Sequence, residues 1–241
     1  MTPIRRPRMD ETLRLQIDRW QQVELQRRPG REMDLRVVTF SREVGSGGRL
    51  IAARVAQILD LPYYDREIIQ LVDQGGDATT SGSAGQEAAD DLVVRRWARQ
   101  PEDDLEGEDP RGPLSLSPEE YRTRLQRVME AIADGEGGAV LGRGANFILP
   151  RERSLRVRVV APLDIRVEYL AAMMGVDREQ ARAAAVQGDA RRRAFTRETF
   201  DADVDDATGY DLVLNMDLYT LDAAVVMVLQ AWGAARQIWD L

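Results

Sequence analysis

The sequence VVTFSREVGSGGRLI, residues 37–51, places a glycine-rich turn between a strand and a helix. The β-branched run Val37–Phe40 predicts a buried strand, and apolar residues from Leu50 onward repeat with helical spacing. Three glycines in the turn let the main chain bend tightly and approach an anion without a Cβ in the way. Several backbone N–H groups and the positive end of the helix then point to one place, which predicts a phosphate-binding loop.

The residue that closes this loop is an arginine. Phosphate-binding loops of nucleotide kinases close with lysine, whereas this loop closes with Arg49, and all 33 basic residues of the chain are arginine. Glu43 stands where such a loop opens with glycine, and Leu50 stands where a hydroxyl would help to hold Mg²⁺. A guanidinium places its donors differently from an ammonium group, so geometry decides whether catalysis is retained. The residues predicted to bind phosphate are Gly45, Ser46, Gly47, Gly48 and Arg49.

Composition excludes several classes of chemistry. The chain has 241 residues and a net charge of −8, which suits one α/β domain with an appendage and argues against binding to nucleic acid or to an anionic membrane. It contains neither cysteine nor histidine, so disulfides, thiolate or imidazole metal sites and Ser-His or Cys-His nucleophiles are excluded. Carboxylates, hydroxyls, arginines and backbone dipoles remain, and they suit phosphoryl transfer, which relies on positioning and charge. No membrane helix or signal peptide is recognisable, so we expect a cytoplasmic protein.

Strand and helix patterns alternate along the chain. After the first strand, strands are predicted at 61–65, 139–141, 156–160 and 211–215, and helices at 50–59, 66–73, 118–133, 164–174, 177–186 and 221–235. Such alternation predicts a mostly parallel sheet with helices on both faces and ligands outside the carboxyl ends of the strands.

Two segments fall outside this pattern. Residues 1–34 contain a helical repeat of apolar positions, which predicts a helical arm ahead of a domain at 35–241. The arm either packs on its own domain or forms the contact of a homodimer. Residues 75–117 are acidic and rich in glycine, serine and proline, which predicts a mobile insert.

The glycine-rich loop and the segment after it resemble a known family. The sequence SREVGSGGR at 41–49, followed by LPYYDREII at 61–69, resembles the start of the cytidylate kinase-like family, relatives of the P-loop nucleoside monophosphate kinases. The resemblance extends over roughly residues 36–232. It implies a P-loop kinase-like fold, Mg²⁺ with ATP as the phosphate donor, and transfer to a nucleoside monophosphate or another small acceptor.

A second segment, GRGANFILP at 142–150, is similar to the Gly-Arg-Gly segment of that family. The resemblance implies that Arg143 grips the monophosphate of the acceptor, whereas the alternative is a solvated arginine in a turn. Arg143 follows the strand predicted at 139–141, so we expect it at the same sheet edge as the glycine loop. Gly144 stands where cytidylate kinases carry an aspartate that helps to recognise the base, so cytosine specificity is open.

A third segment, DARRRAFTR at 189–197, resembles the arginine-bearing lid that closes over the transferred phosphate. The resemblance implies a lid at 187–205 in which Arg192, Arg193 and Arg197 are catalytic, since guanidinium forks bind phosphate oxygens. The alternative is the solvated face of a helix.

Asp65 corresponds to an aspartate that lies near the acceptor in cytidylate kinases, and Arg66 follows it in the same acceptor-binding segment. Asp65 would orient the acceptor or hold Mg²⁺ through water, with no direct metal ligand predicted elsewhere. As an alternative, Asp65 caps the helix that begins at Arg66.

These patterns leave two main functional hypotheses. The first is a phosphotransferase that resembles cytidylate kinase. The second is a non-catalytic nucleotide sensor, or pseudokinase, that uses the same loop to signal to a partner. An interaction protein on an unused kinase scaffold is a third possibility, and it predicts no stabilisation by nucleotides.

Overall fold

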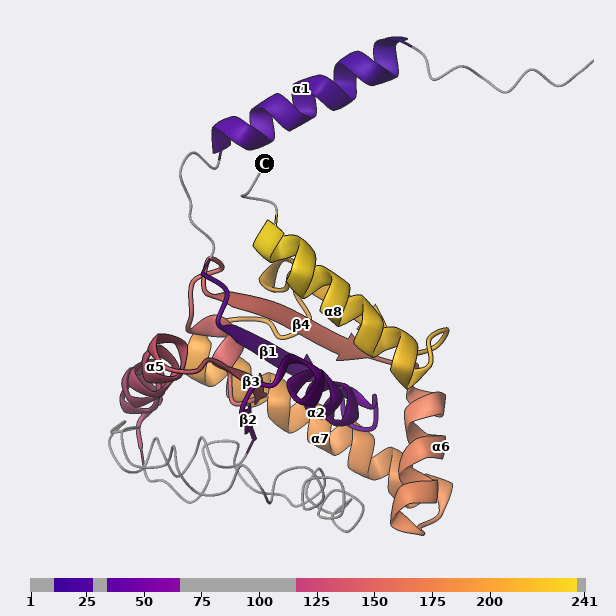
Figure 1. Cartoon of the computed structure of the whole chain (residues 1–241). Helices are drawn as coiled ribbons and strands as arrows, with labels where there is room; N and C mark the ends of the chain where they lie inside the picture. The colour runs from indigo at the N-terminus through magenta and orange to yellow at the C-terminus, as the bar shows by residue number, and fades with distance from the viewer. Residues whose placement is uncertain (1–10, 28–33, 66–115, 238–241) are drawn as a thin grey trace, which may run out of the picture. The chain divides into compact units, whose positions relative to one another are not determined.

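The computed structural model describes residues 11–27, 34–65 and 116–237 (Figure 1). The chain divides into two units, residues 1–33 and 34–241. In the first unit, the described part of the predicted arm forms the helix α1 (Glu11–Arg27). Four of its apolar side chains are exposed, namely Leu13, Ile17, Trp20 and Val23.

The second unit is built on a five-stranded parallel sheet with the order β2-β3-β1-β4-β5 (Figure 1). The strands are β1 (Val37–Arg42), β2 (Tyr63–Tyr64), β3 (Gly138–Leu141), β4 (Ser154–Val160) and β5 (Leu212–Asn215). Each lies within one or two residues of its predicted position, which confirms the parallel α/β fold. The central strand β1 pairs with β3 and β4, so the loop that follows β1 lies in the middle of the sheet edge.

Helices cover both faces of the sheet, as predicted (Figure 1). The helices α2 (Gly48–Leu59) and α8 (Leu221–Gln237) contact each other on one face. The helices α5 (Pro118–Asp134) and α7 (Arg178–Phe200) contact each other on the opposite face, and α6 (Leu163–Met174) packs along α7. Two short 3-10 helices follow β3 and precede β5, namely η3 (Ala145–Phe147) and η4 (Ala207–Gly209).

Helix α5 is held by a buried core along its length and by a cap at its first turn. Tyr121, Leu125 and Met129 are fully buried in one cluster with Val37 and Val140 of the sheet. Burying each of these side chains contributes roughly 2 kcal/mol. Ser117 caps the first turn, because its side chain accepts from the Glu120 amide and the Glu120 carboxylate accepts in return.

Helix α7 is longer than predicted, and this is a correction. The sequence pattern placed its end near Val186, but the helix continues to Phe200 and ends at Asp201 in the left-handed region. Gly188 does not break it, because the missing side chain makes room for Val44, whose Cγ2 lies 2.6 Å from an ideal Cβ. The arginine-rich part of the predicted lid is therefore the second half of one continuous helix.

Several predictions lie outside the described residues. They are the helix at 66–73, the site residue Arg66 and nearly all of the insert at 75–117. In the described ranges, no helix has both the length and the apolar run that crossing a bilayer requires.

Candidate active site

The glycine loop joins the end of β1 to the start of α2. Gly45 and Gly47 have φ angles of +78° and +81°, which favour glycine, and an added side chain on Gly47 would meet nothing within 4 Å. Among the described residues, none accepts a hydrogen bond from the amides of Gly45, Gly47 or Gly48. These N–H groups stand at the N-terminus of a 12-residue helix, where an anion is favoured.

Ser46 lies inside this loop and bonds to the loop itself. Its amide and its hydroxyl both donate to the Glu43 carbonyl, at 3.3 and 2.9 Å. Ser46 is buried, so it stabilises the turn. Of the loop residues predicted to bind phosphate, the three glycines are the ones whose backbone amides have no acceptor among the described residues.

Glu43, which replaces the opening glycine of a standard phosphate loop, has a structural partner. Its Oε2 accepts from the Ala161 amide at 3.0 Å and lies 3.5 Å from Nε of Arg166. The carboxylate therefore ties the start of the loop to the end of β4.

Arg49 and Asp65, two predicted site residues, lie in direct contact. Nε of Arg49 donates to Oδ2 of Asp65 at 3.1 Å, and Nη2 donates to the same oxygen. Both side chains are largely buried. Burial raises the pKa of the neighbouring Tyr63 well above its ordinary value, and the charge of Asp65 acts in the same direction, so the phenol stays protonated. The Arg49 guanidinium is therefore engaged with a carboxylate in this structure.

Arg143 follows β3, and the structure places it at the predicted sheet edge. The Gly142 amide donates to the Phe40 carbonyl at 2.7 Å, which joins this turn to the end of β1. Arg143 has a φ of +58°, in a region that bulky residues rarely adopt, and its carbonyl accepts from the Tyr121 hydroxyl at 3.4 Å. A strained arginine next to two glycines is typical of a functional position.

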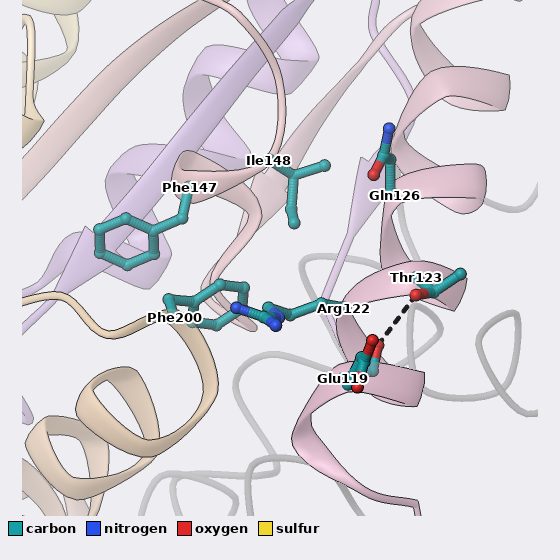
Figure 2. A pocket seen from close by; sticks show the side chains of 7 residues that line it. All are labelled: Glu119, Arg122, Thr123, Gln126, Phe147, Ile148 and Phe200. Atoms are coloured by element: carbon teal, nitrogen blue, oxygen red, sulfur yellow. Dashed lines mark hydrogen bonds between the residues drawn. The ribbon is translucent and has the colours of Figure 1, made fainter.

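The turn after Arg143 is closed by an aromatic ring. An ideal Cβ on Gly144 would lie 2.1 Å from the ring of Phe200, so position 144 has no space for a side chain. Phe200 stacks on Phe147 with ring centroids 5.2 Å apart. Both rings border a hollow of about 460 Å³ between α5, η3 and the end of α7 (Figure 2). Its other lining residues are Glu119, Arg122, Thr123, Gln126 and Ile148.

The three predicted lid arginines have different surroundings. Nη1 of Arg192 donates to the Arg42 carbonyl at 3.1 Å, which brings this residue to the start of the glycine loop. Arg193 instead donates to Asp205 at 2.7 Å, and this hydrogen bond raises the pKa of the guanidinium. Arg197 is exposed on the helix surface. Of the three, Arg192 is the one that contacts the main chain at the start of the glycine loop.

Sequence reasoning missed three residues around the loop. The Arg42 side chain lies against Gly142, with Nη1 2.4 Å from an ideal Cβ, so it stands between the ends of β1 and β3. Arg166 and Asp189 form a buried ion pair beneath the loop. A signal existed for Arg166, because it lies in helical spacing with Leu163 and Leu170, on an apolar stripe.

Comparison with known proteins identifies the family. The pattern of the cytidylate kinase-like family matches residues 37–218, which include the glycine loop, Arg143 and all of α7. The chain belongs to the cytidylate kinase-like family. This membership supports a nucleotide-binding phosphotransferase of the kinase type and does not specify the acceptor. Among curated proteins, no sequence matches the chain.

A solved structure with a TM-score above 0.5 supports the fold. An uncharacterized protein from Eubacterium ventriosum ATCC 27560 is 18% identical with a TM-score of 0.57, and the match covers 80% of this chain and 96% of that one. A shikimate kinase from Bacteroides thetaiotaomicron is 13% identical with a TM-score of 0.43, covering 82% and 98%. A shikimate kinase from Acinetobacter baumannii, in complex with shikimate, is 12% identical with a TM-score of 0.40, covering 84% and 95%. At this similarity neither kinase bears on the chemistry of this chain.

Proposed function

We propose that this protein transfers the γ-phosphoryl group of ATP to a nucleoside monophosphate or another small acceptor. The observation that carries the proposal is the set of Gly45, Gly47 and Gly48 amides at the start of α2, for which no described residue is an acceptor. They share one sheet edge with Arg49 and Arg143, so a donor and an acceptor can meet there.

The hydrogen-bonding groups at this sheet edge fit a magnesium-bound triphosphate. Backbone N–H groups and guanidinium groups suit the phosphate oxygens, and the Asp65 carboxylate lies beside Arg49. The described residues contain no cluster of three acidic side chains that could hold a metal by itself. Mg²⁺ would therefore be held by the phosphates, with Asp65 acting through water, and it would neutralise negative charge during transfer.

Each residue then has one task. The amides of Gly45, Gly47 and Gly48 bind the β- and γ-phosphates, and Arg49 leaves Asp65 to stabilise the same oxygens. Arg143 holds the acceptor, and Arg192 approaches from α7 as charge builds on the transferred group. An acceptor oxygen forms a bond to the γ-phosphorus while the bond from that phosphorus to the β–γ bridging oxygen breaks. ADP leaves with that oxygen.

The acceptor side argues for a substrate other than cytidine monophosphate. The Phe200 ring fills the space beside Gly144 in which an aspartate would recognise cytosine. The hollow lined by Phe147 and Phe200 adjoins this turn and would take the remainder of the acceptor. Its mixture of aromatic and polar groups suits a ring with polar substituents.

The test is a transfer assay with γ-labelled ATP, Mg²⁺ and a panel of nucleoside monophosphates, sugars and small hydroxy acids. The proposal predicts that label reaches one class of acceptor and that chelating Mg²⁺ abolishes this transfer. Absence of transfer, combined with a higher melting temperature in the presence of ATP, would favour the nucleotide sensor. The Arg49–Asp65 contact favours this alternative, because it keeps the closing arginine occupied. If no nucleotide raises the melting temperature, the chain is a scaffold without nucleotide chemistry.

A further inference from the structure

A buried ion pair beneath the glycine loop joins two helices to the loop backbone. Oδ1 of Asp189 on α7 accepts from the Val44 amide at 2.9 Å. Oδ2 of the same carboxylate accepts from Nη1 of Arg166 on α6 at 2.7 Å. The side chains of Asp189 and Arg166 are 7% and 8% exposed, so solvent screens this pair very little.

Arg166 also bonds to the main chain of Val44. Its Nη1 also donates to the Val44 carbonyl at 3.0 Å, and its Nε donates to the Ala161 carbonyl at 2.9 Å. The amide and the carbonyl of Val44 are therefore both held by charged side chains from outside the loop. Two peptide planes, one on each side of Val44, are fixed directly ahead of Gly45.

Packing alone would already hold these helices together. Val44, Val167 and Leu170 form an apolar cluster with Ala181 and Ala185 of α7. Moving a carboxylate and a guanidinium out of water is costly, and apolar residues often replace such pairs without loss of stability. Packing between α6 and α7 therefore does not require the ion pair. A role in fixing the direction of the loop backbone does explain it.

Helix α7, which carries Asp189, also carries Arg192. Arg192 lies three residues after Asp189, about one turn along α7, and donates to the Arg42 carbonyl at the other end of the turn. Asp189 and Arg192 thus contact the main chain on both sides of Glu43. A shift of α7 would move both contacts together.

We propose that Asp189 and Arg166 are positioning residues that hold the glycine loop in its phosphate-binding shape and couple that shape to Arg192. This inference rests on the proposed function, since it assigns the loop to the triphosphate of ATP. Neither residue touches the donor. They act through the peptide groups of Val44.

Binding of MgATP by Asp189→Ala and Asp189→Asn, measured by calorimetry well below the melting temperature, tests the inference. The matched control is Asp164→Ala, because Asp164 pairs with Arg182 between the same two helices on the exposed surface. We expect the dissociation constant to rise at least tenfold for Asp189→Ala and to stay within twofold for Asp164→Ala. Asp189→Asn keeps an oxygen for the Val44 amide and loses the charge, so it should fall between them. If Asp189→Ala does not fold, the comparison between Asp189→Asn and the control decides.

A lower melting temperature with unchanged affinity would show a merely structural pair and overturn the inference. Hydrogen exchange at the amides of residues 43–50 gives a second measurement that needs no ligand. Exchange should be faster in Asp189→Ala than in Asp164→Ala, and equal rates would also overturn the inference. If the wild-type protein itself fails to bind MgATP, the proposed function fails, while the exchange experiment still decides whether Asp189 shapes the loop.

Discussion

The donor and acceptor sides of this sheet edge are built in different ways. On the donor side, backbone amides form the site, and the buried Asp189–Arg166 pair together with Glu43 shapes them from below. On the acceptor side, the candidate residue is the side chain of Arg143, which is partly buried and stands on a strained backbone. A site made of backbone amides depends on the side chains that pack against the loop and hold its shape. A site made of side chains depends directly on the identity of those side chains. Substitutions should therefore act differently on the two sides.

The largest expected effect is the loss of the guanidinium that closes the loop. Arg49→Ala should lower kcat/KM for phosphate transfer by roughly 100-fold or more, because a charge that stabilises the transferred group is removed. Steady-state kinetics with the acceptor found in the screen measures this, with the exposed Arg54→Ala on the same helix as control. Equal activity of the two variants would remove Arg49 from the site.

The second contrast separates packing from backbone strain. Gly144→Ala should cost about 3 kcal/mol in unfolding free energy, because a methyl group must displace the Phe200 ring and adopt a φ of +76°. Gly175→Ala is the matched control, with a φ of +65° and nothing within 4 Å of its Cβ, and it should cost about 1 kcal/mol. Urea denaturation measures both. Similar losses would mean that Phe200 does not close the turn.

The third contrast tests whether the strained arginine is kept for function. Arg143→Gly removes the side chain and relieves the φ of +58°, so the unfolding free energy should change by less than about 1 kcal/mol. The KM for the acceptor should rise by roughly tenfold while the KM for ATP stays unchanged. A rise in both constants would place Arg143 outside the acceptor site.

The smallest effect concerns Asp205, which accepts hydrogen bonds from Arg158 and Arg193. Burial raises the pKa of Asp205, but the hydrogen bond and charge of Arg193 outweigh burial, and the pKa is lowered overall. A carboxylate with a lowered pKa stabilises the fold above its unfolded pKa of about 3.9, and this stabilisation is lost as pH falls through the folded value. Asp205→Asn should cost at most about 1 kcal/mol at pH 7, because the side chain is 41% exposed, and less at about pH 3, which lies below the unfolded pKa. Melting curves at both pH values measure this, and a pH-independent loss would contradict the assignment.

The sequence predicted the sheet well because each strand is a short apolar run with a clear break. The loop was recognisable for the same local reason, since its glycines adjoin a strand and a helix. The end of α7 was not predictable, because Gly188 serves packing against Val44 and not termination. Asp189 and Arg166 were missed because their partner Val44 lies 145 and 122 residues away in the sequence. The contact between Arg49 and Asp65 is likewise a product of tertiary structure.

The most direct test of the central claim is an NMR titration of the loop amides in ¹⁵N-labelled protein. With MgATP, and equally with inorganic tripolyphosphate, the resonances of Gly45, Gly47 and Gly48 should shift together, whereas adenosine should leave them unchanged. If MgATP does not move these resonances, or adenosine moves them as much, the glycine loop does not bind the phosphates.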